Sequence, residues 1–317
     1  MSSVSTPFLS IVIPVFQAER TLRACVTSIQ EQTWTDWELL LVDDGSKDNS
    51  LVVCNTLAST DSRIRVLHQE NQGPSAARYT GVLHAVGTWV TFVDADDTLP
   101  PTALATLSSA TSDTTDIVLG NGYSLRGEHR RCIPMTDFRH LAVRGEGTIG
   151  LPWGSLYRRA ILNATHFDVP TDIRMGEDYI FWLRLVFSTE RPVTIIYDRV
   201  YDKGEDHACS TFRWTAAYAF RIHELRKSAI PEEKRSDYLA DMIEDRIDNL
   251  FTVAVTCPKH EWINSPFYQE IQADLHTLHK QLSLKRRLFL HLPSRFWRKT
   301  YSRISNLLYK CKRLTNP

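Results

Sequence analysis

Paired cysteines and long apolar runs are both absent from this sequence of 317 residues. The six cysteines, at positions 25, 54, 132, 209, 257 and 311, are scattered and include no C-x-x-C pair. This spacing argues against a zinc site and a disulfide scaffold, and it favours a reducing, cytosolic compartment. No apolar run approaches the roughly 18 to 20 residues that cross a bilayer. The apolar segment 8–16 follows no basic region and contains Pro14, so we expect a strand there and not a signal peptide.

Acidic residues are missing from the last part of the chain. Residues 284–317 contain ten Lys or Arg and no Asp or Glu, although the whole chain balances 37 basic with 37 acidic residues. Aromatic residues interleave with these bases, a pattern typical of a basic amphipathic helix on a membrane surface. Two alternatives remain open: RNA binding, which nothing in residues 1–211 supports, and packing on the acidic helical segment 214–280. We predict membrane association of the tail and no nucleic-acid partner.

Short β-branched runs alternate with stretches of helical spacing over the first two thirds of the chain. Because the runs are continuously apolar, they predict a mostly parallel sheet with helices on both faces. The region 120–175 has no clear period, and from about Trp214 the pattern is helical. We therefore expect an α/β domain over residues 1–212, a helical extension over 213–283 and the basic tail over 284–317. The predicted strands are 9–15, 37–42, 64–68, 89–93, 117–119 and 193–197. The predicted helices are 18–32, 75–86 and 177–187, with one more that Asp48 caps and that ends at about 58, and another that starts at Pro100-Pro101.

Carboxylates directly follow two of the predicted strands. Asp43 and Asp44 end the second strand, and Asp94, Asp96 and Asp97 end the fourth. Open parallel sheets bind ligands beyond the carboxyl ends of their strands, so both clusters are expected to line one crevice. Like charges this close repel unless a cation neutralises them, and Mg²⁺ or Mn²⁺ prefers such oxygen ligands. The simpler alternative is a solvated loop that caps the next helix.

Several short motifs occur in a fixed order along the chain. They are S-I-V-I-P-V-F, L-L-V-D-D-G-S-K-D-N-S, N-Q-G-P-S-A-A-R and F-V-D-A-D-D, followed by G-E-D-Y. Together they resemble the inverting family-2 glycosyltransferases, over roughly residues 8–211. The resemblance implies a GT-A nucleotide-sugar-binding fold with a Rossmann-like sheet. It also implies a UDP-sugar donor, a divalent metal (Mn²⁺ or Mg²⁺), and transfer to a hydroxyl of a saccharide or lipid-linked acceptor. Such an enzyme would build a bacterial surface polysaccharide or lipopolysaccharide at the cytoplasmic face of the membrane.

The first three motifs carry the nucleotide contacts that the resemblance implies. The backbone of Pro14 and Val15 would border the base, and Asp44 would accept a hydrogen bond from a uracil ring. Arg78 would lie by the nucleotide or its phosphates. The simpler interpretations are a turn aspartate and a surface helix arginine. Tyr79 departs from the asparagine that the family commonly has after this arginine, which puts the fine contacts in doubt.

The fourth motif supplies the metal site that the resemblance implies. Asp94 would face the ribose and Asp96 would bind the metal, while Asp97 is expected only to cap the following helix. His207 falls where the family often has a loop that closes over the diphosphate, and it is a second candidate metal ligand. A surface histidine without a ligand is the alternative.

Two further features concern the acceptor side. Glu177 and Asp178 open a predicted buried helix, whose dipole favours carboxylates at this end. The resemblance makes Asp178 the general base and Glu177 a residue that orients the base or the acceptor; ordinary helix-end charge is the alternative. Trp153 is a candidate contact for an acceptor sugar, and a core tryptophan is the competing interpretation.

Two other classes of protein fit the sequence less well. A sugar nucleotidyltransferase needs a glycine-rich loop after its first strand, but that position reads P-V-F-Q-A-E-R and contains no glycine. A non-catalytic nucleotide-sugar-binding protein at the membrane would not need the complete set of acids. The sequence does not identify the sugar, the acceptor or the linkage.

Overall fold

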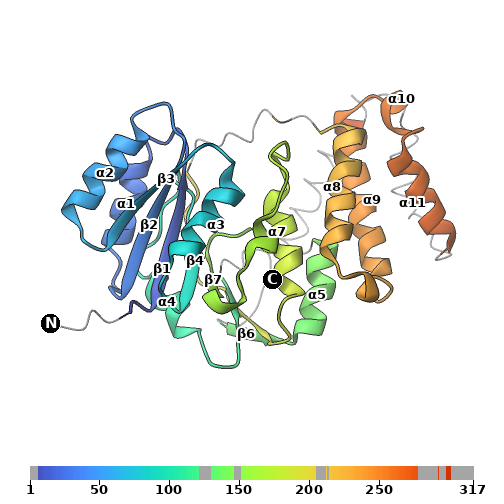
Figure 1. The fold of residues 1–317 in the computed structure, drawn as a ribbon. Coiled ribbons are helices and arrows are strands. Elements are labelled where there is room, and N and C mark those ends of the chain that lie inside the picture. Colours follow the sequence, from blue (N-terminus) through green and yellow to red (C-terminus); the bar gives the residue numbers. More distant parts are fainter. Residues whose placement is uncertain are drawn as a thin grey trace. The chain divides into compact units, whose positions relative to one another are not determined.

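The chain divides into two compact units, Met1–Ser210 and Thr211–Pro317. The first unit is a central sheet with helices on both faces (Figure 1), which confirms the predicted α/β class. The second unit is helical. A computed structural model describes residues 6–120, 130–145, 151–204, 212, 214–277, 292 and 298–300.

The strands of the first unit form one sheet in the order β3-β2-β1-β4-β7-β5-β8-β6. The strands from β3 to β4 are parallel, while β7 is antiparallel to both of its neighbours and β6 is antiparallel to β8. The strands β6 and β7 lie in the region whose sequence showed no period. The strand bounds are β1 (Leu9–Val15), β2 (Trp37–Asp44), β3 (Ile64–Gln69), β4 (Trp89–Phe92), β5 (Ile117–Leu119), β6 (Arg130–Ile133), β7 (Ser155–Arg158) and β8 (Val193–Ile196).

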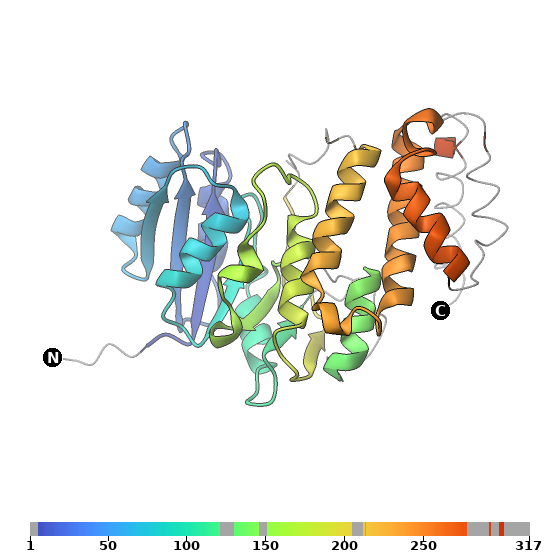
Figure 2. The same ribbon diagram turned by 45° about the vertical axis from the view of Figure 1, so that its right-hand side comes forward.

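Alternate side chains of the strands pack into two separate cores. On β1, Ile11 and Ile13 pack with α1, α2 and α4, while Val12 packs with α3, α5 and α7. All three are fully buried, and each such side chain contributes roughly 1.5 to 3 kcal/mol. Figure 2 shows the blue helices α1 and α2 on one side of the blue strands and the cyan helix α3 on the other. The helices are α1 (Leu22–Gln30), α2 (Ser50–Thr60), α3 (Pro74–His84), α4 (Ala103–Ser109), α5 (Met135–Arg144), α6 (Ala164–Phe167) and α7 (Glu177–Val186), with a 3-10 turn at Arg159–Ile161.

The strand order reverses beside β1, and this reversal fixes where a ligand can bind. From β1 the chain moves outward to β2 and β3, and then α3 carries it back to β4 on the other side of β1. A Cβ on Gly81 of α3 would lie 2.3 Å from a methyl carbon of Val12, so only glycine lets the helix approach β1 this closely. The crevice of such sheets lies at the carboxyl ends of the two strands at the reversal, β1 and β4.

Pro14 lies within β1 and does not end it, because the strand continues to Val15. The backbone N–H of Val93 donates to the carbonyl of Val12 at 3.1 Å, so the backbone polar groups of Val12 point toward β4. Since these groups alternate in direction along a strand, the nitrogen of Pro14 points toward the same side. The paired part of β4 ends at Phe92, opposite Val12. A proline is tolerated in this central strand because no ladder bond is required at its nitrogen.

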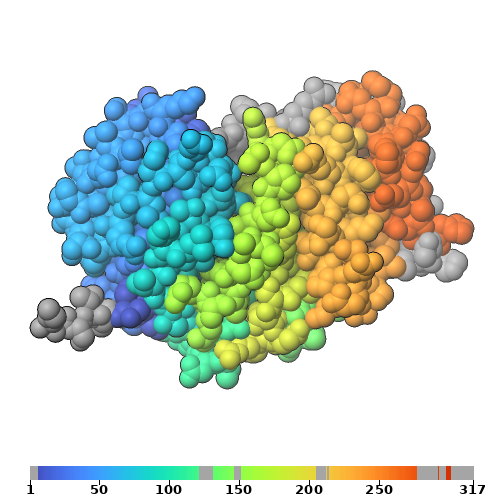
Figure 3. Space-filling view, viewed as in Figure 1, coloured from blue at the N-terminus to red at the C-terminus, as the bar shows by residue number. Residues whose placement is uncertain are grey.

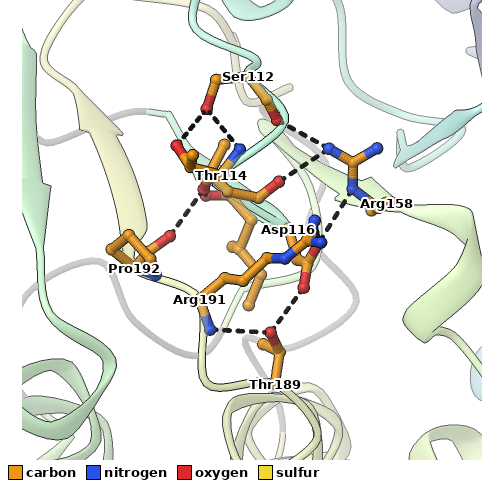
Figure 4. Close-up of polar contacts among 9 residues, drawn as sticks. Ser112, Thr114, Asp116, Arg158, Thr189, Arg191 and Pro192 are labelled. Atoms are coloured by element: carbon orange, nitrogen blue, oxygen red, sulfur yellow. Dashed lines mark hydrogen bonds and ion pairs between the residues drawn. The ribbon is translucent and has the colours of Figure 1, made fainter.

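A buried carboxylate joins three segments at the opposite edge of the sheet, where β5 and β8 begin. Asp116 Oδ1 accepts from Arg158 Nε at 2.9 Å and from Arg191 Nη1 at 3.1 Å, and its Oδ2 accepts from Thr189 Oγ1 at 2.6 Å (Figure 4). Asp116 is 5% exposed. Since no residue of this cluster belongs to the predicted crevice, we assign it a structural role.

Asp116→Ala is expected to lower the free energy of unfolding by about 3 kcal/mol, because it removes the buried carboxylate on which the partly buried Arg158, Arg191 and Thr189 converge. Calorimetric or urea-induced unfolding measures the change. Arg191→Ala is the matched control, with an expected loss below about 1 kcal/mol, since the arginine side chain is 50% exposed. Equal losses in the two variants would contradict the assigned role.

The helical unit packs around a core of its own, which includes Ile243, Leu250, Trp262 and Phe267. Arg298, in the basic tail, is 1% exposed and donates from Nε to the carbonyl of Ala254 near the end of α9. At this residue the tail packs on the helical unit, as the alternative interpretation of the tail required. In the described part of the chain, no helix is both long and apolar enough to span a membrane. The helices are α8 (Ala216–Ala229), α9 (Leu239–Thr256), α10 (Lys259–Trp262) and α11 (Pro266–Thr277), with a 3-10 turn at Glu232–Lys234.

Candidate active site

One buried arginine links acids from two distant parts of the sequence. Arg78, in the second turn of α3, donates from Nη2 to Asp94 Oδ1 at 2.9 Å and from Nη1 to Asp178 Oδ1 at 2.8 Å. Its side chain is 7% exposed, against 30% for Asp94 and 23% for Asp178. Burial opposes its charge, but Asp178 and Asp94 outweigh this and raise the pKa of Arg78. Three residues that the sequence had singled out separately thus form one charged cluster.

The cluster lies where α3 meets the end of β4 and the start of α7. Figure 3 shows the blue-green surface of α3 beside the yellow-green surface of the segment that leads into α7. Gly176 precedes this helix with φ of +92°, a conformation that favours glycine. At the other end, Arg139 donates to the carbonyls of Val186 and Thr189, both at 2.9 Å. Gly176 thus sets the start of α7 and Arg139 binds the carbonyls at its end. These contacts fix the position of the helix that carries Asp178.

Burial changes the titration of both acids at the start of α7. It raises the pKa of Glu177 to about 7, and the neighbouring Asp178 carboxylate adds to the effect. Burial also raises the pKa of Asp178, while Arg78 opposes that rise. Because the charge of Asp178 contributes to the raised pKa of Glu177, the titrations of the two carboxyls depend on each other. A pair of this kind can both accept and hold a proton.

Glu177→Gln is expected to stabilise the protein above pH 7. Since the folded-state pKa of Glu177 lies above its unfolded value, wild-type stability falls as pH rises from about 4.5 to about 7. The neutral amide removes this cost, so the variant should gain roughly 1 to 3 kcal/mol above pH 7 and nothing below about pH 4. Unfolding measured from pH 4 to pH 8.5 tests this, with the exposed Glu31→Gln as control. A variant no more stable than wild type at pH 8 would refute the prediction.

The acids after β4 form a tight turn, in which the backbone N–H of Asp97 donates to the carbonyl of Asp94 at 3.1 Å. Asp97 is 2% exposed, and its Oδ1 accepts from the backbone N–H of Gly204 at 2.7 Å. The predicted helix cap at Asp97 is wrong, because α4 begins only at Ala103, after Thr102. A Cβ on Gly204 would lie 2.1 Å from the carbonyl oxygen of Asp96. The hydrogen bond to Asp97 therefore keeps the segment around Gly204 in contact with the acidic turn. Asp96, in the same turn, is partly exposed.

Asp44 is engaged by the loop that leads into α3. Its Oδ1 accepts from Gln69 Nε2 at 2.8 Å and from the Gln72 N–H at 2.9 Å, and its Oδ2 accepts from the Gly73 N–H at 2.8 Å. The residue is 2% exposed. Asp44 thus shapes the entry to the helix that carries Arg78. The contact of Asp44 with a uracil ring stays a prediction. Oδ2 is the better candidate for this contact, because it accepts one of these hydrogen bonds and Oδ1 accepts two.

The remaining predicted residues differ in how the structure treats them. Pro14 and Val15 lie at the carboxyl end of β1, as expected for a border of the crevice. Trp153 is 7% exposed and stacks on Tyr201 with ring centroids 4.4 Å apart, so little of the indole is open to a sugar. His207 lies outside the described residues.

Sequence reasoning missed two exposed residues at this edge. Phe16, directly after β1, is 47% exposed, and the next residue, Gln17, has φ of +51° and donates its N–H to Ser46 Oγ at 3.1 Å. Lys203 lies with Nζ 4.5 Å from the ring centroid of Trp153, and its charge acts on both Asp97 and Asp178. An aromatic residue directly after a buried strand was the available signal for Phe16; for Lys203 there was none.

Residues 10–180, more than half of the chain, match the family model for glycosyl transferase family 2, and the chain belongs to this family. The uncharacterized glycosyltransferase EpsJ of Bacillus subtilis is 32% identical over 198 residues, 58% of this chain and 58% of EpsJ. The chain therefore spans little more than half the length of this relative.

Two solved structures share the fold. Staphylococcus aureus TarS 1-349 in complex with UDP has a TM-score of 0.57 at 16% identity, covering 84% of this chain and 87% of that one. The mannosyltransferase PcManGT from Pyrobaculum calidifontis, in complex with GDP-Man and Mn²⁺, has a TM-score of 0.53 at 16% identity, covering 94% and 85%. The predicted GT-A glycosyltransferase fold is confirmed by these likenesses.

Proposed function

We propose that this chain is an inverting glycosyltransferase that moves a sugar from a nucleotide donor, most plainly a UDP-sugar, to an acceptor hydroxyl. The supporting observation is the contact of one guanidinium with both Asp94 and Asp178. A transferase needs a donor-binding acid and an acceptor-side base on either side of the reacting carbon. The contact of Arg78 with both carboxylates at the switch point of the sheet supports the assignment of these two roles to Asp94 and Asp178.

The acidic turn fits a divalent cation by the chemistry of its donors. Asp96 offers carboxylate oxygens for the ion, to which the donor would add phosphate oxygens, while Arg78 engages Oδ1 of Asp94 and leaves its Oδ2 for the ribose. Mn²⁺ or Mg²⁺ is the ion such a set prefers. When bound there, it would supply charge neutralisation for a departing diphosphate. Lys203 carries a positive charge beside the same turn and would add to this effect.

The acceptor side of the reaction is assigned to the start of α7. The acceptor hydroxyl gives its proton to Asp178 as its oxygen bonds to the anomeric carbon. The bond from that carbon to the phosphate oxygen breaks on the opposite face, so the configuration inverts and the nucleoside diphosphate leaves. Arg78 orients the base through Oδ1, and its positive charge opposes the rise that burial causes in the pKa of Asp178. Glu177, with a pKa of about 7, can hold a proton near neutral pH and hydrogen-bond to the acceptor.

The nucleotide base is assigned to the ends of β1 and β2. Pro14 and Val15 would border it, and Phe16 presents an exposed ring on which a base can stack. Asp44 would contact it through Oδ2. TarS is bound to UDP in its structure, which supports uracil, whereas PcManGT is bound to GDP-Man.

The acceptor is proposed to be a saccharide or lipid-linked hydroxyl of a bacterial surface polymer. Trp153 borders Tyr201 and Lys203 on this side. The basic tail 284–317 is proposed to bring the enzyme to the inner face of the cell membrane, with Arg298 taken up by the helical unit. The finer identity of sugar and acceptor rests on experiment.

A screen of UDP- and GDP-sugars with Mn²⁺, with and without a chelator, tests the proposal directly. Purified protein is incubated with membrane-extracted lipid-linked acceptors, and mass spectrometry detects the added sugar. We expect chelator-sensitive transfer from one donor and, by NMR, a product of inverted anomeric configuration. Donor binding without any turnover would instead identify a non-catalytic nucleotide-sugar-binding protein, and a retained configuration would refute the single-displacement mechanism.

A further inference from the structure

A histidine is buried in the helical unit with no hydrogen-bond partner in the described part of the chain. His223 of α8 is 2% exposed, and both of its ring nitrogens are buried without a partner. An imidazole ordinarily donates from one nitrogen and accepts at the other. Buried polar groups that lack both contacts are rare in folded proteins and require an explanation.

Two carboxylates converge on this imidazole. Glu224 Oε1 lies 3.8 Å from His223 Nε2, although neighbouring residues of a helix ordinarily point apart. Glu270 of α11 completes the group, in which one ligand atom from each residue lies within 4.8 Å of the others. Tetrahedral Zn²⁺ with bonds of about 2.0 to 2.2 Å needs ligand atoms roughly 3.3 to 3.5 Å apart. Small side-chain rotations would therefore bring all three into bonding distance.

We propose that His223, Glu224 and Glu270 form a binding site for Zn²⁺ or a similar divalent transition ion, which ties α8 to α11. The donor set is one imidazole nitrogen with two carboxylate oxygens, a combination that suits zinc and leaves a fourth position for water. Glu224 is exposed and Glu270 is partly exposed, so an ion can enter from solvent. The site shares no residue with the acidic turn of the sheet and does not depend on the proposed reaction.

Arg246, Lys227 and Arg226 oppose an added positive charge at His223, but the two arginines also pair with carboxylates outside the proposed site. Arg246 Nη1 contacts Glu270 Oε2 at 3.2 Å and also pairs with Asp274. Glu270 can bind an ion through Oε1 while Oε2 stays on Arg246, an outer contact that would orient the ligand. Lys227 reaches Glu224 Oε1 only at 3.9 Å, with both side chains largely exposed.

Zinc titration of the chelator-treated, full-length protein tests the site by calorimetry, with elemental analysis after gel filtration. We expect one equivalent of Zn²⁺ and a higher Tm in its presence. His223→Gln, Glu224→Gln and Glu270→Gln should each weaken Zn²⁺ binding at least tenfold. Two controls should leave it unchanged: His260→Gln, an exposed histidine of the same unit, and Asp96→Ala, which alters the acidic turn of the sheet.

The outcomes separate the alternatives. Absence of zinc binding by folded wild-type protein, or an affinity unchanged in Glu224→Gln and Glu270→Gln, would overturn the site. Loss of the bound equivalent in Asp96→Ala would do the same, because the ion would then belong to the sheet. Glu224 is exposed, so its variant answers the question even where His223→Gln does not fold.

Discussion

Asp178→Asn is expected to reduce sugar transfer at least a hundredfold while donor binding changes less than about threefold. A positioned general base contributes roughly 10² to 10⁴ in rate, and the amide cannot accept the acceptor's proton. The amide oxygen can still accept the hydrogen bond from Arg78, so the cluster with Asp94 keeps its arrangement. Steady-state transfer rates and calorimetric donor affinity, both with Mn²⁺, measure the two effects separately.

The matched control is Asp168→Asn, the same substitution at the end of α6 in the segment before α7. Asp168 is exposed and lies outside the cluster around Arg78, so transfer should stay within about twofold of wild type. Transfer above about one tenth of the wild-type rate in Asp178→Asn would remove this residue from the role of base. Loss of donor affinity together with activity would make it a donor-binding residue instead.

Local pattern predicted the parallel half of the sheet because its strands are buried on both faces. The run from Ile11 to Val15 is apolar throughout and fully or largely buried, so strand and burial are both visible in the sequence. The strands β6 and β7 are only four residues long and join the sheet antiparallel, in positions that depend on partners distant in sequence. No local period can encode such pairing.

The residue types of the site were predictable, but their mutual contacts were not. Motifs identified Arg78, Asp94 and Asp178 as separate functional candidates, and only the fold shows that one guanidinium joins the last two across residues far apart in sequence. Asp97 had the look of a helix cap because Pro100-Pro101 follows soon after. Its carboxylate instead accepts a hydrogen bond from the backbone N–H of Gly204, more than a hundred residues later. No local sequence pattern predicts a hydrogen bond between residues so far apart.

Arg78→Gln is expected to shift the acid limb of the pH profile of kcat/KM to higher pH. Burial raises the pKa of Asp178 and the Arg78 charge opposes it, so removal of the charge lets that pKa rise further. The base must be ionised to act, and activity is therefore lost at a higher pH as the solution is acidified. Initial rates from pH 5.5 to pH 9.5 would show weak transfer at neutral pH and partial recovery in alkaline solution.

Arg78→Lys separates the charge of this residue from its geometry. A lysine keeps the positive charge but, as a single ammonium group, cannot hold two carboxylates in the planar fork that the guanidinium provides. We expect a smaller shift of the acid limb than in Arg78→Gln, with transfer still far below wild type because Asp94 and Asp178 are no longer held together. As a control, Arg63→Gln removes a partly buried ion pair with Asp61 outside the cluster around Arg78, and it should leave the profile unchanged. If both Arg78 variants lower the rate equally at every pH, the arginine only supports the fold, and the ionisation of Asp178 must be maintained by other groups.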